Sequence, residues 1–208
     1  VYNGININSH KYHAKPTEPS YLAFLGRMSP EKGSHLAIEI AKKSGWRLKM
    51  AGKVDAVDKL FFESEIKPHI DGKQIEYLGE ATHADKNELM GGAVATLFPI
   101  TWREPFGLVM VESMAAGTPV IAMNLGSAPE VINPGVSGFL CNDVSECVNA
   151  IDKAAQLDRY AVRQYVTQQF SAQRMADGYE EVYRKILAEK FAQNGRLRSQ
   201  VISAASYN

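Results

Sequence analysis

The sequence contains little cysteine, no excess charge of either sign and no long apolar run. Only two of its 208 residues are cysteine, Cys141 and Cys147, and no Asn-x-Ser/Thr glycosylation acceptor occurs. Such a composition argues against the disulfide framework of a small secreted domain. The longest apolar stretches, such as 93–100, are far below the roughly 20 residues that a membrane-spanning helix needs. With no signal peptide recognised at its start, we expect a protein of a reducing, cytoplasmic compartment that does not span a membrane.

The charge balance argues against a further class of partner. The 23 Lys and Arg residues match 23 Asp and Glu residues, so the formal net charge is zero. A chain of this kind lacks the broad basic surface that general nucleic-acid binding uses, although a local patch suffices for a phosphorylated small molecule. With 45% hydrophobic residues, the chain is also long enough to bury a continuous core. We therefore expect a globular protein with no nucleic-acid partner.

Short apolar runs alternate with segments of helical periodicity from residue 21 to about residue 140. Because strands that alternate with helices form parallel sheets covered on both faces, this pattern predicts a doubly wound, Rossmann-like α/β fold of about six strands. The expected strands are 21–25, 47–52, 74–79, 93–98, 119–122 and 138–140, and the expected helices between them are 34–43, 58–69, 82–91 and 106–117.

The two ends of the chain differ from this middle part. Helices are predicted after the sheet, over 144–157, 159–170 and 171–191, and residues 192–208 form a weakly patterned tail. Residues 1–20 carry Asn, Ser, His and Pro without periodicity, which is typical of a linker or of the remnant of a preceding segment. The predicted domain with its C-terminal helices therefore spans residues 21–191.

The loop after the first expected strand carries two cations. In a doubly wound sheet, ligands bind outside the carboxyl ends of the strands, so candidate site residues are sought there. Gly26 is expected to permit a sharp turn, and Arg27 and Lys32 lie beside the start of a helix, where anions are favoured. The pattern suits a diphosphate, but two solvated side chains in an ordinary loop explain it equally well. The Walker pattern and the Gly-x-Gly-x-x-Gly fingerprint are both absent here.

The loop after the fourth expected strand carries two carboxylates. Glu104 lies in the loop, Gly107 stands at the start of the next helix, and Glu112 follows within that helix. Open amides at a helix start bind phosphate, whereas carboxylates accept hydrogen bonds from hydroxyl groups. This combination fits a ligand with hydroxyls on both sides of its phosphates, such as a ribose and a sugar. The turn 125–130 is a weaker candidate, which either lines the sugar pocket or is an ordinary turn.

Four sequence motifs follow one another along the chain. They are Gly26-Arg27-x4-Lys32-Gly33, Glu104-Pro-Phe-Gly-Leu-x3-Glu112-Ser-Met-Ala-x-Gly117-Thr-Pro-Val-Ile, Gly126-Ser-x-Pro-Glu130-Val and Gly135-Val-Ser-Gly138-Phe-Leu. Together they resemble the C-terminal half of the group 1 retaining glycosyltransferases, which have the GT-B fold. The similarity extends from about Tyr21 to Leu187, and the opening stretch 1–5 resembles the junction between that family's two domains. The resemblance implies one half of a two-domain enzyme.

The resemblance also implies roles for the residues that match its motifs. Arg27 and Lys32 neutralise the donor diphosphate, and Glu112 binds the ribose hydroxyls. Glu104 faces the transferred sugar and helps to stabilise an oxocarbenium-like transition state. The other donor-binding positions that it implies are Gly26, Leu78, Gly79, Phe106, Gly107 and Leu108, of which Leu78 and Gly79 lie near the base. In this family, Arg and Lys take the place of a metal, so no metal and no cofactor are expected; the absence of an Asp-x-Asp motif agrees.

The expected function is retaining transfer of a hexose from a nucleoside diphosphate, such as UDP-glucose or GDP-mannose, to an acceptor hydroxyl. The acceptor is a glycan, a lipid or a small molecule, held by an N-terminal domain outside this chain, so the chain alone is expected to be inactive. Peripheral membrane association of the full enzyme is compatible with a lipid acceptor. Two alternatives stay open: an epimerase or phosphorylase of the same fold, and a nucleotide-sugar binding module without catalysis. Lys53 is either solvated or close to the phosphates or the acceptor.

Overall fold

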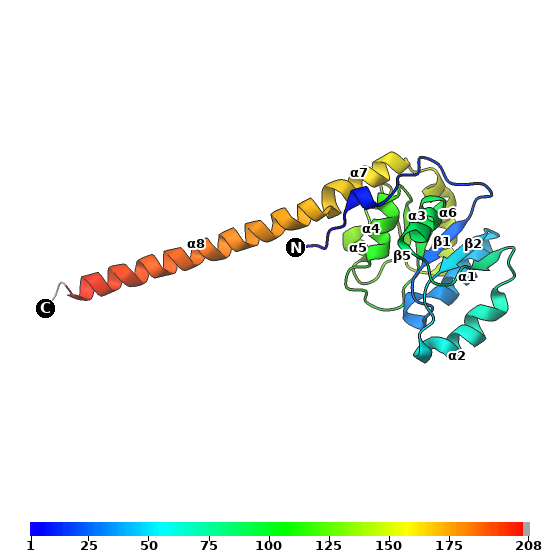
Figure 1. Cartoon of the computed structure of the whole chain (residues 1–208), viewed down its shortest axis with the longest axis horizontal. Helices are drawn as coiled ribbons and strands as arrows, with labels where there is room; N and C mark the ends of the chain where they lie inside the picture. The colour runs from blue at the N-terminus through cyan, green and yellow to red at the C-terminus, as the bar shows by residue number, and fades with distance from the viewer. Residues whose placement is uncertain (206–208) are drawn as a thin grey trace.

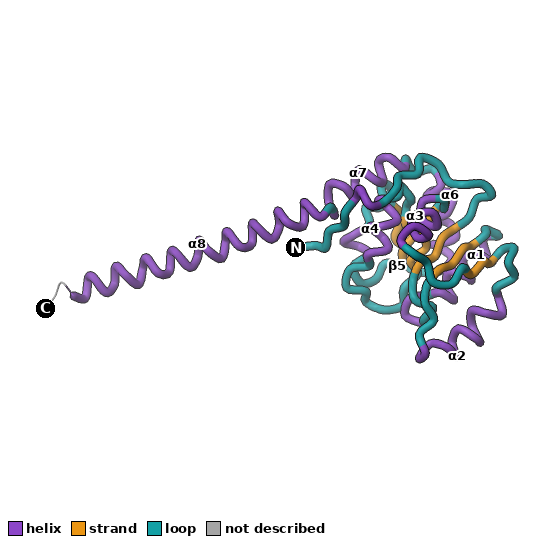
Figure 2. Tube along the Cα trace, in the orientation of Figure 1, coloured by secondary structure: helices purple, strands orange, loops and turns teal. Residues whose placement is uncertain are grey.

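A parallel sheet forms the centre of the molecule (Figure 1, Figure 2). The computed structural model describes residues 1–205, and the side chains of residues 1–191. The six strands lie in the order β3-β2-β1-β4-β5-β6, and every neighbouring pair is parallel. Each overlaps a predicted strand, which confirms the doubly wound α/β fold. The strand bounds are β1 Leu22–Leu25, β2 Leu48–Ala51, β3 Ile75–Tyr77, β4 Ala95–Phe98, β5 Val120–Met123 and β6 Gly138–Cys141.

Helices cover both faces of the sheet. In β1, Leu22 and Phe24 face a core shared with α1 and α6, whereas Ala23 and Leu25 face a core shared with α3. This alternation follows from the two-residue period of a strand, and it explains why a strand buried on both faces is apolar throughout. The helix bounds are α1 Ser34–Ser44, α3 His83–Gly91, α4 Leu108–Ala115, α5 Ala128–Val131, α6 Val144–Ala155 and α7 Arg159–Phe170.

The segment between β2 and β3 differs from its prediction as one helix over 58–69. It consists of short 3-10, α and π pieces, which are η3 Ala56–Asp58, α2 Lys59–Phe61, η4 Phe62–Ile66 and η5 Lys67–His69. Pro68 supplies no backbone N–H and its ring crowds the preceding turn, so a regular helix does not continue through it. A capping box begins α3, with Thr82 and Asp85 bonded reciprocally.

Residues 1–20 lie along the domain and pack against it. Ile5 N–H donates to the Phe170 carbonyl at 2.9 Å, and Ala172 N–H donates to the Ile5 carbonyl at 2.9 Å. Arg163 of α7 donates to the carbonyls of His10 and Ile7 at 2.9 and 3.2 Å. The segment that the sequence places outside the domain is therefore bound to it through backbone carbonyls, which leave no periodic pattern in the sequence.

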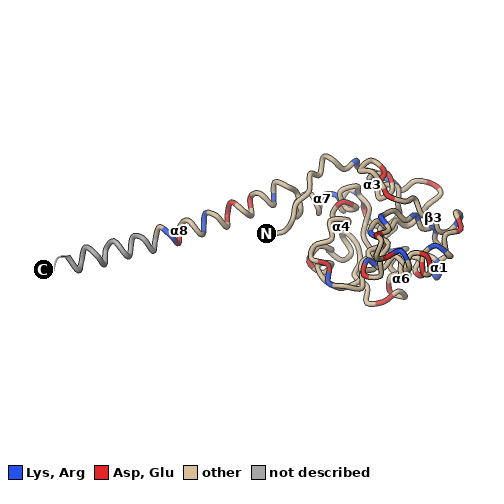
Figure 3. The backbone as a smooth tube through the Cα atoms, turned by 60° about the horizontal axis from the view of Figure 1, so that its bottom comes forward, with Lys and Arg blue, Asp and Glu red and all other residues tan. Residues whose placement is uncertain are grey.

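The helix α8 (Ala172–Ala205) projects away from the rest of the molecule (Figure 1, Figure 2). It continues past residue 191, where the helical pattern of the sequence fades, so most of the expected tail 192–208 is helical; residues 206–208 lie outside the described residues. Groups of positively and negatively charged residues follow one another along its first part (Figure 3). None of the helices in the described part of the chain combines the length and apolar character that a membrane span requires.

Candidate functional site

The loops after β1, β2 and β4 meet at the carboxyl edge of the sheet, where two adjoining pockets share Gly26 and Val109 in their walls. One pocket, of about 340 Å³, is lined by Lys32 and Glu104 among others and is named here the Lys32 pocket. The second, of about 260 Å³, is lined by Arg27 and is named the Arg27 pocket. The sheet thus brings together the cationic loop and the carboxylate loop. Lys32 and Glu104, one from each loop, are 72 residues apart in the sequence.

Lys32 and Glu104 form an ion pair inside their pocket. The Lys32 ammonium contacts Oε2 of Glu104, and the indole Nε1 of Trp102 donates to the same oxygen at 2.9 Å. The ammonium also lies 5.0 Å from the centroid of the Trp102 ring. Only 23% of the Lys32 side chain and 13% of the Glu104 side chain are exposed. Because two donors converge on one oxygen of Glu104, its other oxygen, Oε1, is left for a ligand hydroxyl or a developing positive charge.

The turn after β5 packs against the backbone of Glu104. A Cβ atom at Gly126 would lie 2.5 Å from the Glu104 backbone nitrogen, and Gly126 has a φ of 60°. Ser127 N–H donates to the Glu104 carbonyl at 3.0 Å, and its hydroxyl donates to the Phe106 carbonyl at 2.8 Å. The turn that the sequence marked as a weak candidate therefore positions the carboxylate loop through its backbone.

The start of α4 closes the other side of the Lys32 pocket. Gly107 has a φ of 74°, and a Cβ atom there would lie 2.8 Å from side-chain atoms of Phe98 and Met110. Gly107, Leu108 and Phe106 all line the pocket. The first N–H groups of a helix have no acceptor within that helix, so this end offers amide donors and a positive partial charge to an anion.

The glycine that the cationic loop requires is Gly33 rather than Gly26. Gly33 has a φ of 72°, and a Cβ atom there would lie 1.8 Å from the Pro99 carbonyl oxygen. The chain bends at Gly26 as expected, but Gly26 does not adopt the left-handed conformation, so this bend does not require a glycine. Instead, Gly52 approaches the Gly26 carbonyl so closely that a Cβ atom would lie 1.7 Å from that oxygen. Close packing of neighbouring loops, which sequence spacing does not reveal, decides which glycine is needed.

Three carboxylates surround Arg27. Its guanidinium contacts Glu31, lies 3.4 Å from Oδ2 of Asp55 and lies 3.9 Å from Oδ2 of Asp58. The other Asp55 oxygen, Oδ1, is 2.7 Å from the ammonium of Lys53. Hydrogen bonds and charge from Lys53, and then from Arg27, hold the pKa of Asp55 below its ordinary value. The sequence patterns did not indicate these acids, because they come from two loops and their grouping depends on the pairing of β1 with β2.

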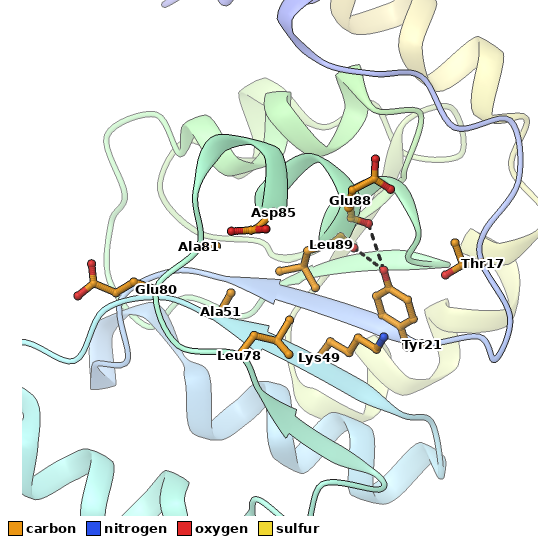
Figure 4. A pocket seen from close by; sticks show the side chains of 10 residues that line it. All are labelled: Thr17, Tyr21, Lys49, Ala51, Leu78, Glu80, Ala81, Asp85, Glu88 and Leu89. Carbon is orange, nitrogen blue, oxygen red and sulfur yellow. Dashed lines mark hydrogen bonds between the residues drawn. The ribbon is translucent and has the colours of Figure 1, made fainter.

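A third pocket, larger than these two at about 540 Å³, is lined by Leu78, which precedes Gly79 in the chain (Figure 4). Lys49 extends across its floor with its ammonium 4.4 Å from the centroid of the Tyr21 ring, and the Tyr21 hydroxyl donates to the Leu89 carbonyl at 2.9 Å. The sequence reasoning missed Lys49, although a lysine in the middle of a buried strand was the available signal. The lining residues are Thr17, Tyr21, Lys49, Ala51, Leu78, Glu80, Ala81, Asp85, Glu88 and Leu89.

A family model described as glycosyl transferases group 1 matches residues 6–169 of this chain. The chain belongs to this family. A glycogen synthase of Mycobacterium tuberculosis is 31% identical over 198 residues, which cover 88% of this chain and 47% of that protein. A D-inositol 3-phosphate glycosyltransferase of Mycobacterium bovis is 29% identical over 208 residues, which cover 90% of this chain and 42% of that protein. The chain therefore spans about half the length of these relatives.

Solved structures confirm the fold of this glycosyltransferase domain. The Anabaena protein HepE in complex with UDP superposes with a TM-score of 0.75 at 24% identity, covering 89% of this chain and 57% of that one. AviGT4, a glycosyltransferase involved in avilamycin A biosynthesis, gives a TM-score of 0.76 at 24% identity, covering 90% of this chain and 58% of that one. At this level of identity the similarity concerns the fold, and the predicted GT-B half is confirmed.

The structure gathers most of the expected site residues of this glycosyltransferase, but not all of them. Lys32 and Glu104 share one pocket with the start of α4, and Arg27 lines the adjoining one. Glu112, one turn along α4 from Leu108, is half-buried, and within the described part of the chain it lines neither pocket. Among the described residues, no three His, Cys, Asp or Glu side chains gather as candidate metal ligands.

Proposed function

We propose that this chain is the donor-binding half of a retaining glycosyltransferase that transfers a hexose from UDP or GDP to an acceptor hydroxyl. One observation carries the proposal: a cation, a carboxylate and an open helix start, namely Lys32, Glu104 and the first turn of α4, meet in one pocket at the carboxyl edge of the sheet. A diphosphate requires the cation and the amides, and a sugar beside it requires the carboxylate.

In this proposal, the bond that breaks joins the anomeric carbon of the hexose to the terminal phosphate oxygen. Negative charge then builds on the departing diphosphate, where Lys32, Arg27 and the amides of α4 stabilise it. Positive charge builds on the sugar ring, and the carboxylate of Glu104, which faces the ring, stabilises it. Because these groups are already positioned by the fold, stabilisation by charge is proposed to replace a metal or other cofactor.

The rest of the function belongs to the same proposal. The acceptor, a glycan, a lipid or a small molecule, is held by a second domain outside this chain, and Glu112 receives the ribose once the donor is bound. The third pocket adjoins the Leu78–Gly79 loop, which supports placing the base at that end. A cytoplasmic location, where nucleotide sugars are available, and membrane association only at the periphery complete the proposal.

Calorimetric titration of the chain with UDP, GDP and ADP and with their hexose conjugates tests this function. We expect one nucleotide to bind, and Lys32→Met to weaken it about tenfold or more, because a charge-assisted contact to phosphate is lost. The matched control is Lys43→Met, since Lys43 is an exposed cation of α1 paired only with Glu39 on its own helix among the described residues. Equal weakening by both variants, or no binding to a folded chain at millimolar concentration, contradicts the proposal.

A separate measurement distinguishes catalysis from binding alone. The variant Glu104→Gln keeps the size of the side chain but removes its charge. We expect nucleotide affinity to be retained or to rise, because Lys32 loses its carboxylate partner. Donor hydrolysis or transfer by the longer enzyme should fall about a hundredfold or more, because a charge that stabilises the transition state is lost. Unchanged turnover would favour the binding module instead.

A further inference from the structure

Asp55 bridges two cations at the mouth of the Arg27 pocket. Its two oxygens face different partners, with Oδ1 at 2.7 Å from the Lys53 ammonium and Oδ2 at 3.4 Å from the Arg27 guanidinium. Both cations line the pocket that adjoins the Lys32 pocket. The side chain of Lys53 is 62% exposed and that of Asp55 is 27% exposed, so a ligand that enters from solvent can reach both.

The charges around Asp55 leave no surplus cation for a diphosphate. Arg27 and Lys53 contribute two positive charges, and Glu31, Asp55 and Asp58 contribute three negative ones, so the cluster carries a net charge of −1. In the next pocket, Lys32 is balanced by Glu104. Lys86 and Glu80 also line the Arg27 pocket, but they do not pair within 4.0 Å of each other. A diphosphate that binds Arg27 or Lys53 therefore has to replace a carboxylate there.

Asp55 is the carboxylate that the fold needs least. It precedes η3, but its side chain makes no capping hydrogen bond to that helix. Arg27 retains Glu31 and Asp58 as partners when Asp55 is removed, whereas Lys53 has no other carboxylate within 4.0 Å in the described part of the chain. The hydrogen bond that Lys53 donates to Asp55 raises the pKa of Lys53, which agrees with a direct pair. Loss of Asp55 consequently releases Lys53 while Arg27 stays in position.

Resting on the proposed donor-binding function, we propose that Lys53 is a third cation for the donor diphosphate and that Asp55 competes with the diphosphate for Lys53 and Arg27. When the donor enters, the Asp55 side chain turns away and the phosphate oxygens take its place on the two cations. The exchange replaces one anion with another, so Arg27 and Lys53 have an anionic partner both before and after the donor binds. Asp55 thereby sets how tightly the donor binds and how readily the nucleoside diphosphate leaves.

Titration of UDP and of inorganic pyrophosphate into the wild-type chain and its variants tests this inference. We expect Asp55→Asn to bind both ligands about fivefold more tightly, the effect of removing one screened charge at contact distance. Asp55→Glu, which keeps the carboxylate, should retain wild-type affinity. The matched control is Glu39→Gln, because Glu39 is a carboxylate paired with a lysine on α1 and lines neither the Lys32 pocket nor the Arg27 pocket.

A second substitution tests the part assigned to Lys53. Adding Lys53→Met to Asp55→Asn should cancel the gain in affinity, since the released cation is no longer there. The gain should also shrink as the salt concentration rises, because exposed charges are screened. Melting temperatures within about 2 °C of wild type for all variants would show that the changes in affinity are not caused by changes in folding stability.

The outcomes separate this inference from the function on which it rests. If the wild-type chain binds UDP and Asp55→Asn binds it equally or more weakly, Asp55 does not compete and the inference is wrong. If Asp55→Asn gains affinity and the added Lys53→Met leaves the gain intact, Lys53 is not a cation of the site. If no variant binds UDP or pyrophosphate while all are folded, the donor-binding function itself fails, and this inference fails with it.

Discussion

Two successive helices, α7 and α8, carry apolar side chains at nearly the same spacing but bury them to different extents. In α7, Val162, Val166 and Phe170 are all buried. In α8, the side chains of Tyr179, Val182, Tyr183, Ile186, Leu187 and Phe191 are 40–73% exposed. The two helices are separated only by Ser171. Amphipathic periodicity therefore predicts that a helix forms, but not that its apolar face is covered.

The difference arises from what lies beside each helix. Arg159 enters the body of the molecule and donates to the carbonyls of His13, Gly91 and Ala93 and to the hydroxyl of Thr118, over 2.5–2.8 Å. It thereby joins residues 1–20 to the α3–β4 and α4–β5 connections. The described side chains of α8 have charged partners mainly one turn away on the same helix, such as Arg184 with Glu180. Contact with the body, rather than the helix sequence, distinguishes the two.

The largest expected effect comes from removing the contact of α7 with the body. Arg159→Met should lower the free energy of unfolding by about 3–4 kcal/mol, because three buried carbonyls lose a charged donor. Burial already lowers the pKa of Arg159 to about 10, so the guanidinium is held by these bonds rather than by solvent. Urea unfolding measures the change. For the control Arg184→Met in α8, the free energy of unfolding should stay within about 0.5 kcal/mol of the wild-type value. Equal losses for the two variants would mean that α7 and α8 do not differ in their contact with the body of the molecule.

One substitution made in both helices sharpens the comparison. Val166→Ala should cost about 2 kcal/mol, because two buried methyl groups leave a cavity in a fully covered site. Val182→Ala, at a valine that is 40% exposed, should cost less than about 0.5 kcal/mol. Thermal melting of the two variants compares them directly. A loss at Val182 as large as that at Val166 would show that α8 is covered in solution.

The smallest expected effect is a pH dependence from two partly buried histidines, His13 beside α7 and His35 in α1. His13 has 10% of its side chain exposed and packs beside Arg159, and burial lowers its pKa below the ordinary 6.5. As the pH falls below about 6.5, the unfolded chain takes up a proton before the folded chain does, so stability decreases. Burial lowers the pKa of His35 too, with the same sign.

Unfolding measured between pH 7.5 and pH 5.5 checks this expectation. His13→Gln and His35→Gln should each reduce the slope of stability against pH. An unaltered slope in His13→Gln would mean that residues 1–20 do not hold His13 away from solvent.

Much of the site was predictable from the sequence because its residues stand in short motifs next to strands. Lys32 and Glu104 were found in this way, and the structure places them in contact. The acids around Arg27 were not found, because each is an ordinary loop residue until β1 and β2 pair. The role of Gly33 was missed for a similar reason, since its requirement comes from the Pro99 carbonyl of another loop.

The sequence by itself determined the strands, the helices and the loops that carry the candidate chemistry, because backbone periodicity and turn residues act over a few neighbouring positions. Only the tertiary structure decided three other matters: the docking of residues 1–20, the compensation of Arg27 by Asp55 and its neighbours, and the exposure of α8. Each depends on distant parts of the chain meeting in space. Hydrogen bonds to backbone carbonyls and pairing of charges across loops are short-range in space but leave no mark in the local sequence.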